Sequence, residues 1–127
     1  MTPSTQTRVT LFGIPNCDTV KKARLWLAEH GVDAQFHDFK KAGVPGDRLE
    51  AWIAALGWDA LLNRRGTTWR ALDDAQRAAV VDAASAAALM RAQTSLIKRP
   101  VVEWPGAGAS AVVTITVGFD ADAWAQR

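Results

Sequence analysis

The chain has 127 residues, and its 15 lysines and arginines against 13 aspartates and glutamates give a formal net charge of +2. This length is typical of one globular domain, and a hydrophobic content of 49% excludes disordered and collagen-like classes. Because the charge excess is small, we expect neither a nucleic-acid nor a membrane partner. One cysteine excludes an internal disulfide framework and a multi-thiolate zinc site, and with only two histidines we predict no metal site.

The N-terminal segment MTPSTQT is polar, so we expect no secretory signal there, and residues 1–7 are predicted to be a disordered tail. No stretch approaches the run of about 18 apolar residues that a membrane-spanning helix needs. We therefore expect a soluble, cytoplasmic protein, and a lone thiol suits that reducing compartment.

A strand–helix–strand unit is predicted in the first third of the chain. Residues 8–13 form a short β-rich run that ends at a glycine. After a turn, apolar side chains recur at helical spacing from Cys17 to His30, and Gly31 fits the left-handed position that follows a helix. Residues 34–39 alternate in polarity, which predicts a second strand parallel to the first.

The middle of the chain is predicted to be helical. Residues 40–46 form a turn-rich link, residues 47–56 an amphipathic helix ended by Gly57, and residues 58–62 about one further turn. Residues 63–69, NRRGTTW, have no periodicity and are expected to form a basic loop.

Two more helices are expected before the chain returns to β-structure. One begins at Asp73 or Asp74, and an alanine-rich one begins at Asp82 or Ser85 and ends at Arg91.

The C-terminal part is predicted to be a β-hairpin with a closing helical turn. The segment LIKRPVVEW after Ser95 is β-like, and residues 111–119 are the most β-branched stretch of the chain. Residues 105–110 suit the hairpin connection, and residues 120–127 suit the helical turn. The whole pattern is therefore an α/β domain spanning residues 1–127, with the order β-α-β, a helical insertion over residues 40–95, and then β-β-α around a mixed sheet.

Cys17 stands between the first strand and the first helix. Unpaired N–H groups and the macrodipole at a helix N-terminus favour an anion, so a thiolate there should have a lowered pKa. Alternatively, Cys17 is only a small apolar side chain, and its spacing leaves both interpretations open. Val20 occupies the second thiol position of a CxxC motif, so any redox cycle would need an external thiol.

Arginines are the natural partners of a thiolate or an anionic substrate. Arg64, Arg65 and Arg70 surround the GTTW segment, and we interpret Arg64 and Arg70 as surface cations. Arg99 precedes Pro100 at the start of a predicted strand, which would hold a cation beside the end of the sheet. His30 and His37 lack a second ligand or nucleophile at useful spacing and are interpreted as structural, and the six tryptophans as lining the core or a groove.

Four blocks of the sequence resemble the arsenate reductase-like (ArsC) family, and in particular its YffB-like branch. They read LFGIPNCDTVKKARLWL, LGWDALLNRRGTTWR, DAASAAALM and LIKRPVV, and they lie in the family's order within residues 9–102. The resemblance implies a thioredoxin-like fold with a helical insertion. It extends to Spx-type regulators, which share the fold and bind RNA polymerase but typically carry a CxxC switch that Val20 removes here.

The resemblance also implies roles for single residues. Cys17 matches the catalytic cysteine, Arg99 the arginine before a cis-proline, and Pro100 that proline, so the Arg99–Pro100 bond is expected to be cis. A second family arginine falls on Asn63, and Arg65 is the replacement that we favour. A third has no counterpart in PGAGASAVV, which argues against arsenate as the substrate because a doubly charged oxyanion needs several fixed cations.

Our leading hypothesis is a glutathione-dependent thiol oxidoreductase. Cys17 would form a covalent adduct that external glutathione or a glutaredoxin resolves, with glutathione as co-substrate and no bound cofactor. Arg99 and Arg65 would hold anionic groups beside the helix N-terminus. The further binding residues are expected to be Asn16, Asp18, Arg64 and Pro100. Two alternatives stay open: an arsenate reductase using the same cysteine, and a non-catalytic Spx-like regulator that binds proteins.

Overall fold

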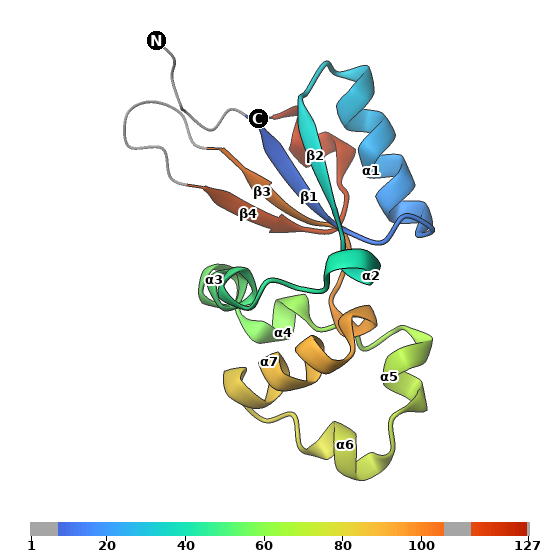
Figure 1. The fold of residues 1–127 in the computed structure, drawn as a ribbon, viewed down its shortest axis with the longest axis vertical. Helices are drawn as coiled ribbons and strands as arrows, with labels where there is room; N and C mark the ends of the chain where they lie inside the picture. The colour runs from blue at the N-terminus through green and yellow to red at the C-terminus, as the bar shows by residue number, and fades with distance from the viewer. Residues whose placement is uncertain (1–7, 106–112, 127) are drawn as a thin grey trace. The chain divides into compact units, whose positions relative to one another are not determined.

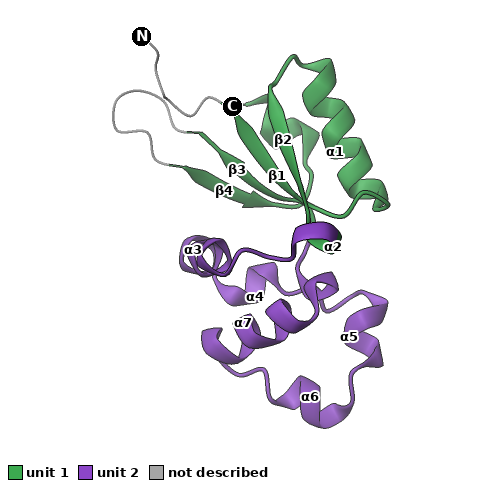
Figure 2. Ribbon diagram, viewed as in Figure 1, with its two compact units in different colours: residues 1–40, 99–127 green, residues 41–98 purple. Residues whose placement is uncertain are grey.

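The computed structural model describes residues 8–105 and 113–126. Within them the chain forms two compact units, which Figure 2 colours separately: a sheet unit, residues 8–40, 99–105 and 113–126, and a helical unit, residues 41–98. The helical unit nearly coincides with the predicted insertion over residues 40–95. The predicted tail, residues 1–7, and all but the first residue of the predicted hairpin connection lie outside the described residues.

The sheet unit contains a mixed four-stranded sheet in the order β2-β1-β3-β4 (Figure 1). The parallel pairing of β1 with β2 confirms the predicted β-α-β unit, and β3 is antiparallel to both β1 and β4. The strands are β1 (Val9–Gly13), β2 (Ala34–Asp38), β3 (Val101–Trp104) and β4 (Thr114–Val117).

Helices α1 (Asp18–Glu29) and α8 (Ala121–Ala125) cover one face of this sheet. Helix α1 contributes three buried side chains at helical spacing, and α8 contributes Trp124, whose ring meets that of Trp104 edge-on at 4.9 Å. Such aromatic contacts add to the free energy gained from burial alone. The buried core comprises Val9, Leu11, Val20, Ala23, Leu27, Val102, Trp104 and Trp124.

The boundaries of α1 follow from its flanking residues. Cys17 is the N-cap, with extended backbone at φ −106° and ψ 125°, and His30 is the C-cap. Gly31 follows with φ +67°, the left-handed conformation that glycine adopts at little cost. The predicted helix, Cys17 to His30, therefore agrees with the structure apart from its two capping residues.

The helical unit is built around a buried apolar core of its own. Helix α3 contacts both α4 and α7, and η1 contacts α5 and α7. The core side chains include Leu49, Trp52, Leu61, Leu62, Met90, Leu96 and Ile97. The helices are α2 (Phe39–Ala42), which leads in from the sheet unit, then α3 (Gly46–Leu56), α4 (Trp58–Leu61), α5 (Thr67–Ala71), α6 (Asp74–Ala78), α7 (Ala83–Ala92) and the 3₁₀ turn η1 (Thr94–Leu96).

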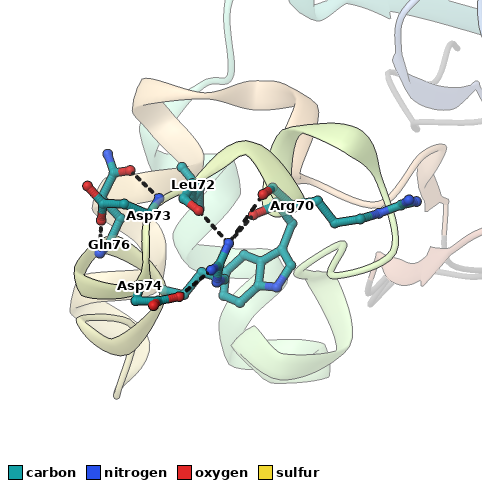
Figure 3. Close-up of polar contacts among 7 residues, drawn as sticks. Arg70, Leu72, Asp73, Asp74 and Gln76 are labelled. Carbon is teal, nitrogen blue, oxygen red and sulfur yellow. Dashed lines mark hydrogen bonds and ion pairs between the residues drawn. The ribbon is translucent and has the colours of Figure 1, made fainter.

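Local capping explains where α6 and α7 begin. Asp73 and Gln76 exchange side-chain and backbone hydrogen bonds in a capping box, which Figure 3 shows, and Asp82 and Ser85 repeat it at α7. The guanidinium of Arg77 pairs with Asp74 at 2.5 Å and donates to backbone carbonyls at the end of α5. Both predicted helix starts are confirmed, at Asp74 and immediately after Asp82.

Three predicted boundaries are wrong. The segment 63–69 is not wholly a loop, because α5 begins at Thr67, and a five-residue helix is too short for an apolar period to reveal it. Phe39 begins α2 instead of ending β2, because the Asp38 carboxylate accepts the Lys40 N–H at 2.8 Å and caps the turn.

The third wrongly predicted boundary is that of the last strand, which the sequence predicts over residues 111–119. Among the described residues, β4 spans only Thr114–Val117, because Gly118 has φ +85° and leaves the extended conformation. Residues 111 and 112 lie outside the described part. Of the helices in the described ranges, none is long and apolar enough to cross a bilayer.

Candidate active site

Cys17 lies in the sheet unit at the N-terminus of α1, four residues after the end of β1. Its side chain is a half-buried free thiol that packs at the edge of the core beneath α1. The sulfur is therefore held by its neighbours while staying partly open to solvent, as a nucleophile must be.

The pKa of the Cys17 thiol lies below its ordinary value. Burial by itself raises this pKa, but the backbone N–H of Val20, the hydrogen bond and positive charge of Arg99, and the N–H of Thr19 lower it by more. The Cys17 side chain has no capping hydrogen bond to α1, and these N–H groups favour the thiolate because it is a stronger acceptor than the thiol. At neutral pH the site therefore holds more thiolate than a free cysteine would.

Arg99 lies near this thiol, and Pro100 follows it immediately before β3. The charge and the hydrogen-bonding groups of the Arg99 guanidinium lower the pKa of the thiol, so the cation that precedes the strand acts at the helix N-terminus. The Arg99–Pro100 peptide bond is cis, as the family resemblance implies. Pro100 is buried, and its carbonyl accepts the Gly118 N–H at 2.8 Å, which ties the start of β3 to the end of β4.

Val20 occupies the position where a CxxC motif would carry its second thiol. Its side chain is fully buried in the core of the sheet unit. Cys17 is the only cysteine of the sequence, so this site cannot form an internal disulfide. Any adduct on Cys17 must be resolved by another molecule.

Arg64 and Arg65 belong to the helical unit. The Arg64 guanidinium pairs with the Asp59 carboxylate at 2.6 Å and lies 5.7 Å and 5.8 Å from the ring centroids of Trp58 and Trp69. The Arg65 carbonyl accepts a hydrogen bond from Arg70, and the Arg65 side chain is exposed. Arg64 thus already has an anionic and two aromatic partners, and the binding roles predicted for both arginines stay predictions.

The remaining residues named from the sequence lie in the sheet unit. Asn16 and Asp18 flank Cys17 and are exposed. Asp18 lies in the first turn of α1, where the helix dipole stabilises a carboxylate. His30 stacks on Trp26 at a centroid distance of 3.8 Å, and His37 contacts Phe12. Within the described ranges, no three His, Cys, Asp or Glu side chains gather as a metal site would require.

The structure thus brings Cys17 and Arg99 together, and Asn16, Asp18 and Pro100 are their neighbours in the chain. Sequence reasoning anticipated a helix N-terminus at the thiol but did not single out the N–H groups of Thr19 and Val20. The signal was available, because residues two and three positions after an N-cap carry the donors that face it.

Comparisons with known proteins agree with this geometry. The ArsC family model matches residues 12–126. A solved structure of a protein named YffB is 49% identical, with a TM-score of 0.81 over 93% of this chain and 96% of that one. An arsenate reductase (ArsC) related protein from Brucella melitensis is 43% identical, with a TM-score of 0.69 over 98% and 97% of the two chains.

A regulator is also similar. The global transcriptional regulator Spx of Streptococcus pyogenes serotype M3 is 30% identical over 97 residues, which cover 74% of this chain and 70% of Spx. The thioredoxin-like α/β fold with a mixed sheet is confirmed by these similarities together with the strand order. The chain is a member of the ArsC family, with arsenate reductase-like and Spx relatives.

Proposed function

We propose that this protein is a glutathione-dependent thiol oxidoreductase with Cys17 as its nucleophile. The observation that carries the proposal is the half-buried thiol at the N-terminus of α1, with a pKa lowered by the Val20 and Thr19 N–H groups and by Arg99. A thiolate of this kind is the attacking species in thiol–disulfide exchange. Membership of a family with arsenate reductase-like relatives supports the same class of chemistry.

The cycle that we propose begins with a mixed disulfide between glutathione and a substrate thiol. The Cys17 thiolate attacks the glutathionyl sulfur, the substrate sulfur leaves as a thiolate that takes up a proton, and Cys17 retains the glutathionyl group. A second glutathione, as its thiolate, attacks that group and releases glutathione disulfide, which restores the Cys17 thiolate. The substrate sulfur is reduced to a thiol and the sulfur of the second glutathione is oxidised, while the first glutathionyl sulfur stays at the disulfide level throughout.

The need for an external thiol follows from the single cysteine of the sequence. Glutathione, or a glutaredoxin, is the reductant we propose because glutathione carries carboxylates that a cation such as Arg99 can bind. Asn16, Asp18 and Pro100, which adjoin Cys17 and Arg99 in the sequence, would contribute further binding contacts. A cytoplasmic location, as expected from the sequence, would supply the reductant.

The test is turnover of hydroxyethyl disulfide with glutathione, coupled to glutathione reductase. We expect the wild-type protein to turn over and Cys17→Ser to lose activity. Leu25→Ser, a change at an exposed position on the same helix, should keep it and serves as the matched control. Equal activity of wild type and Cys17→Ser would overturn the proposal.

Two rivals have specific support and are tested in parallel. Arsenate reduction is suggested by the Brucella relative, and it predicts arsenate-dependent turnover with glutathione and glutaredoxin. A protein-binding regulatory role is suggested by the similarity to Spx. Full complementation of a deletion strain by Cys17→Ser would favour the regulator, because that role needs no nucleophile.

A further inference from the structure

Gly13, the last residue of β1, lies buried where the strand meets the first turn of α1. A Cβ atom on this residue would be 2.8 Å from Val20 Cγ2 and 3.7 Å from Val20 Cγ1. It would also lie 3.9 Å from the Cβ of Arg99. Gly13 thus lies next to both groups that most strongly favour the Cys17 thiolate, which are the first turn of α1 and Arg99.

The conformation of its backbone does not explain why this position is a glycine. Gly13 does not have a positive φ, so other residues could adopt its backbone conformation without strain. What excludes a side chain is the distance to Val20, because real Cβ atoms essentially never approach another atom to 2.8 Å. Gly13 is therefore required by close approach.

Val20 has little freedom to relieve such a contact. Its side chain is β-branched, which restricts χ1 in a helix, and it is fully buried in the core. A methyl group on Gly13 would therefore push on the backbone of the first turn of α1. The Val20 N–H, which favours the thiolate, belongs to that turn.

We infer that Gly13 is a positioning residue for the Cys17 nucleophile. Because Gly13 has no side chain, the first turn of α1 can pack closely against β1, and the N–H groups of that turn and Arg99 can then act on the same sulfur. The inference rests on the proposed role of Cys17. Gly13 acts only through Val20 and Arg99 and touches no substrate.

The experiment is the rate of Cys17 alkylation by iodoacetamide as a function of pH. With Gly13→Ala we expect alkylation about threefold or more slower below the wild-type inflection, and equal rates in alkaline solution where every thiol is ionised. Adding Val20→Ala removes the two methyl groups that the new Cβ would meet, so Gly13→Ala/Val20→Ala should regain the profile of Val20→Ala. Leu27→Ala, a cavity in the same core away from the thiol, should lower stability without moving the inflection.

If Gly13→Ala does not fold, the Val20→Ala background supplies the test. There Gly13→Ala should leave the profile unchanged, whereas Gly13→Val, which adds one carbon more than Val20→Ala removes, should again push on the first turn of α1 and slow alkylation. Unchanged alkylation in folded Gly13→Ala, or in folded Gly13→Val/Val20→Ala, overturns the inference and leaves the proposed function intact. A wild-type inflection at or above that of free glutathione would instead overturn the proposed function.

Discussion

The guanidinium of Arg99 lowers the pKa of the Cys17 thiol, and this interaction joins the start of β3 to the N-terminus of α1. Its effect is electrostatic, because a cation and an N–H donor both favour the thiolate over the thiol. Arg99 and the helix N-terminus thus converge on one atom from two elements.

Replacing Arg99 should raise the pKa of Cys17. Arg99→Met removes both the hydrogen bond and the charge, so we expect alkylation about tenfold slower below the wild-type inflection and little change well above it. Arg99→Lys keeps a charge without the planar donor and should be intermediate. Superimposable profiles of alkylation rate against pH for all three proteins would contradict the assigned role of Arg99.

Introducing a thiol at residue 20 should change how the adduct is resolved. After exposure to glutathione disulfide, the wild-type protein should retain one glutathionyl group by mass spectrometry, because it has no second cysteine. Val20→Cys places a thiol in the first turn of α1, and we expect this variant to release glutathione and form a disulfide between Cys17 and the introduced thiol. Val20→Ser, a polar change of similar size without a thiol, is the control and should keep the adduct. A stable adduct on Val20→Cys would mean that the buried side chain cannot reach Cys17.

The two neighbouring arginines of the helical unit should differ in their contribution to turnover. The Arg64 guanidinium is held by Asp59 and two tryptophan rings, whereas the Arg65 side chain is exposed. We expect Arg65→Ala to lower kcat/KM for the glutathione-dependent reaction by about tenfold, and Arg64→Ala to lower it less. Because the Arg64–Asp59 pair is largely exposed, its loss should cost at most about 1 kcal/mol in urea unfolding. A larger kinetic loss in Arg64→Ala would reverse the assignment of Arg65.

Asp82 should make the stability of the helical unit depend on pH. The N–H and the hydroxyl of Ser85 both donate to the Asp82 carboxylate, at 2.9 Å and 2.8 Å, and lower its pKa. Since a lowered pKa favours the folded state only while the carboxylate is ionised, this contribution is present above the unfolded pKa of about 3.9. It is lost as the pH falls through the lower folded pKa.

The pH-dependent contribution of Asp82 can be measured by urea unfolding of the wild-type protein and of Asp82→Asn at several pH values. The asparagine keeps a capping oxygen but does not titrate. We expect the stability difference from wild type to be present at neutral pH and to shrink in acid. A difference that is independent of pH would show that the ionised carboxylate contributes nothing beyond the cap.

The sequence by itself determined the α/β order, the position of the thiol and the starts of α6 and α7. Each of these depends on interactions within a few residues. Asp73 and Asp82 begin helices through bonds to residues three positions on, and Gly31 ends α1 through its own φ. The position of Cys17 at a helix N-terminus is likewise visible in the local sequence, because apolar residues at helical spacing follow it directly.

Only the tertiary structure decided which groups act on the thiol and why Gly13 has no side chain. Arg99 reaches Cys17 because antiparallel pairing sets β3 beside β1, a contact between residues far apart in the chain. The 2.8 Å approach of Val20 to a Gly13 Cβ depends equally on how α1 packs on the sheet. Periodicity reports which face of an element is buried, whereas contacts of this kind depend on distances that only the folded chain sets.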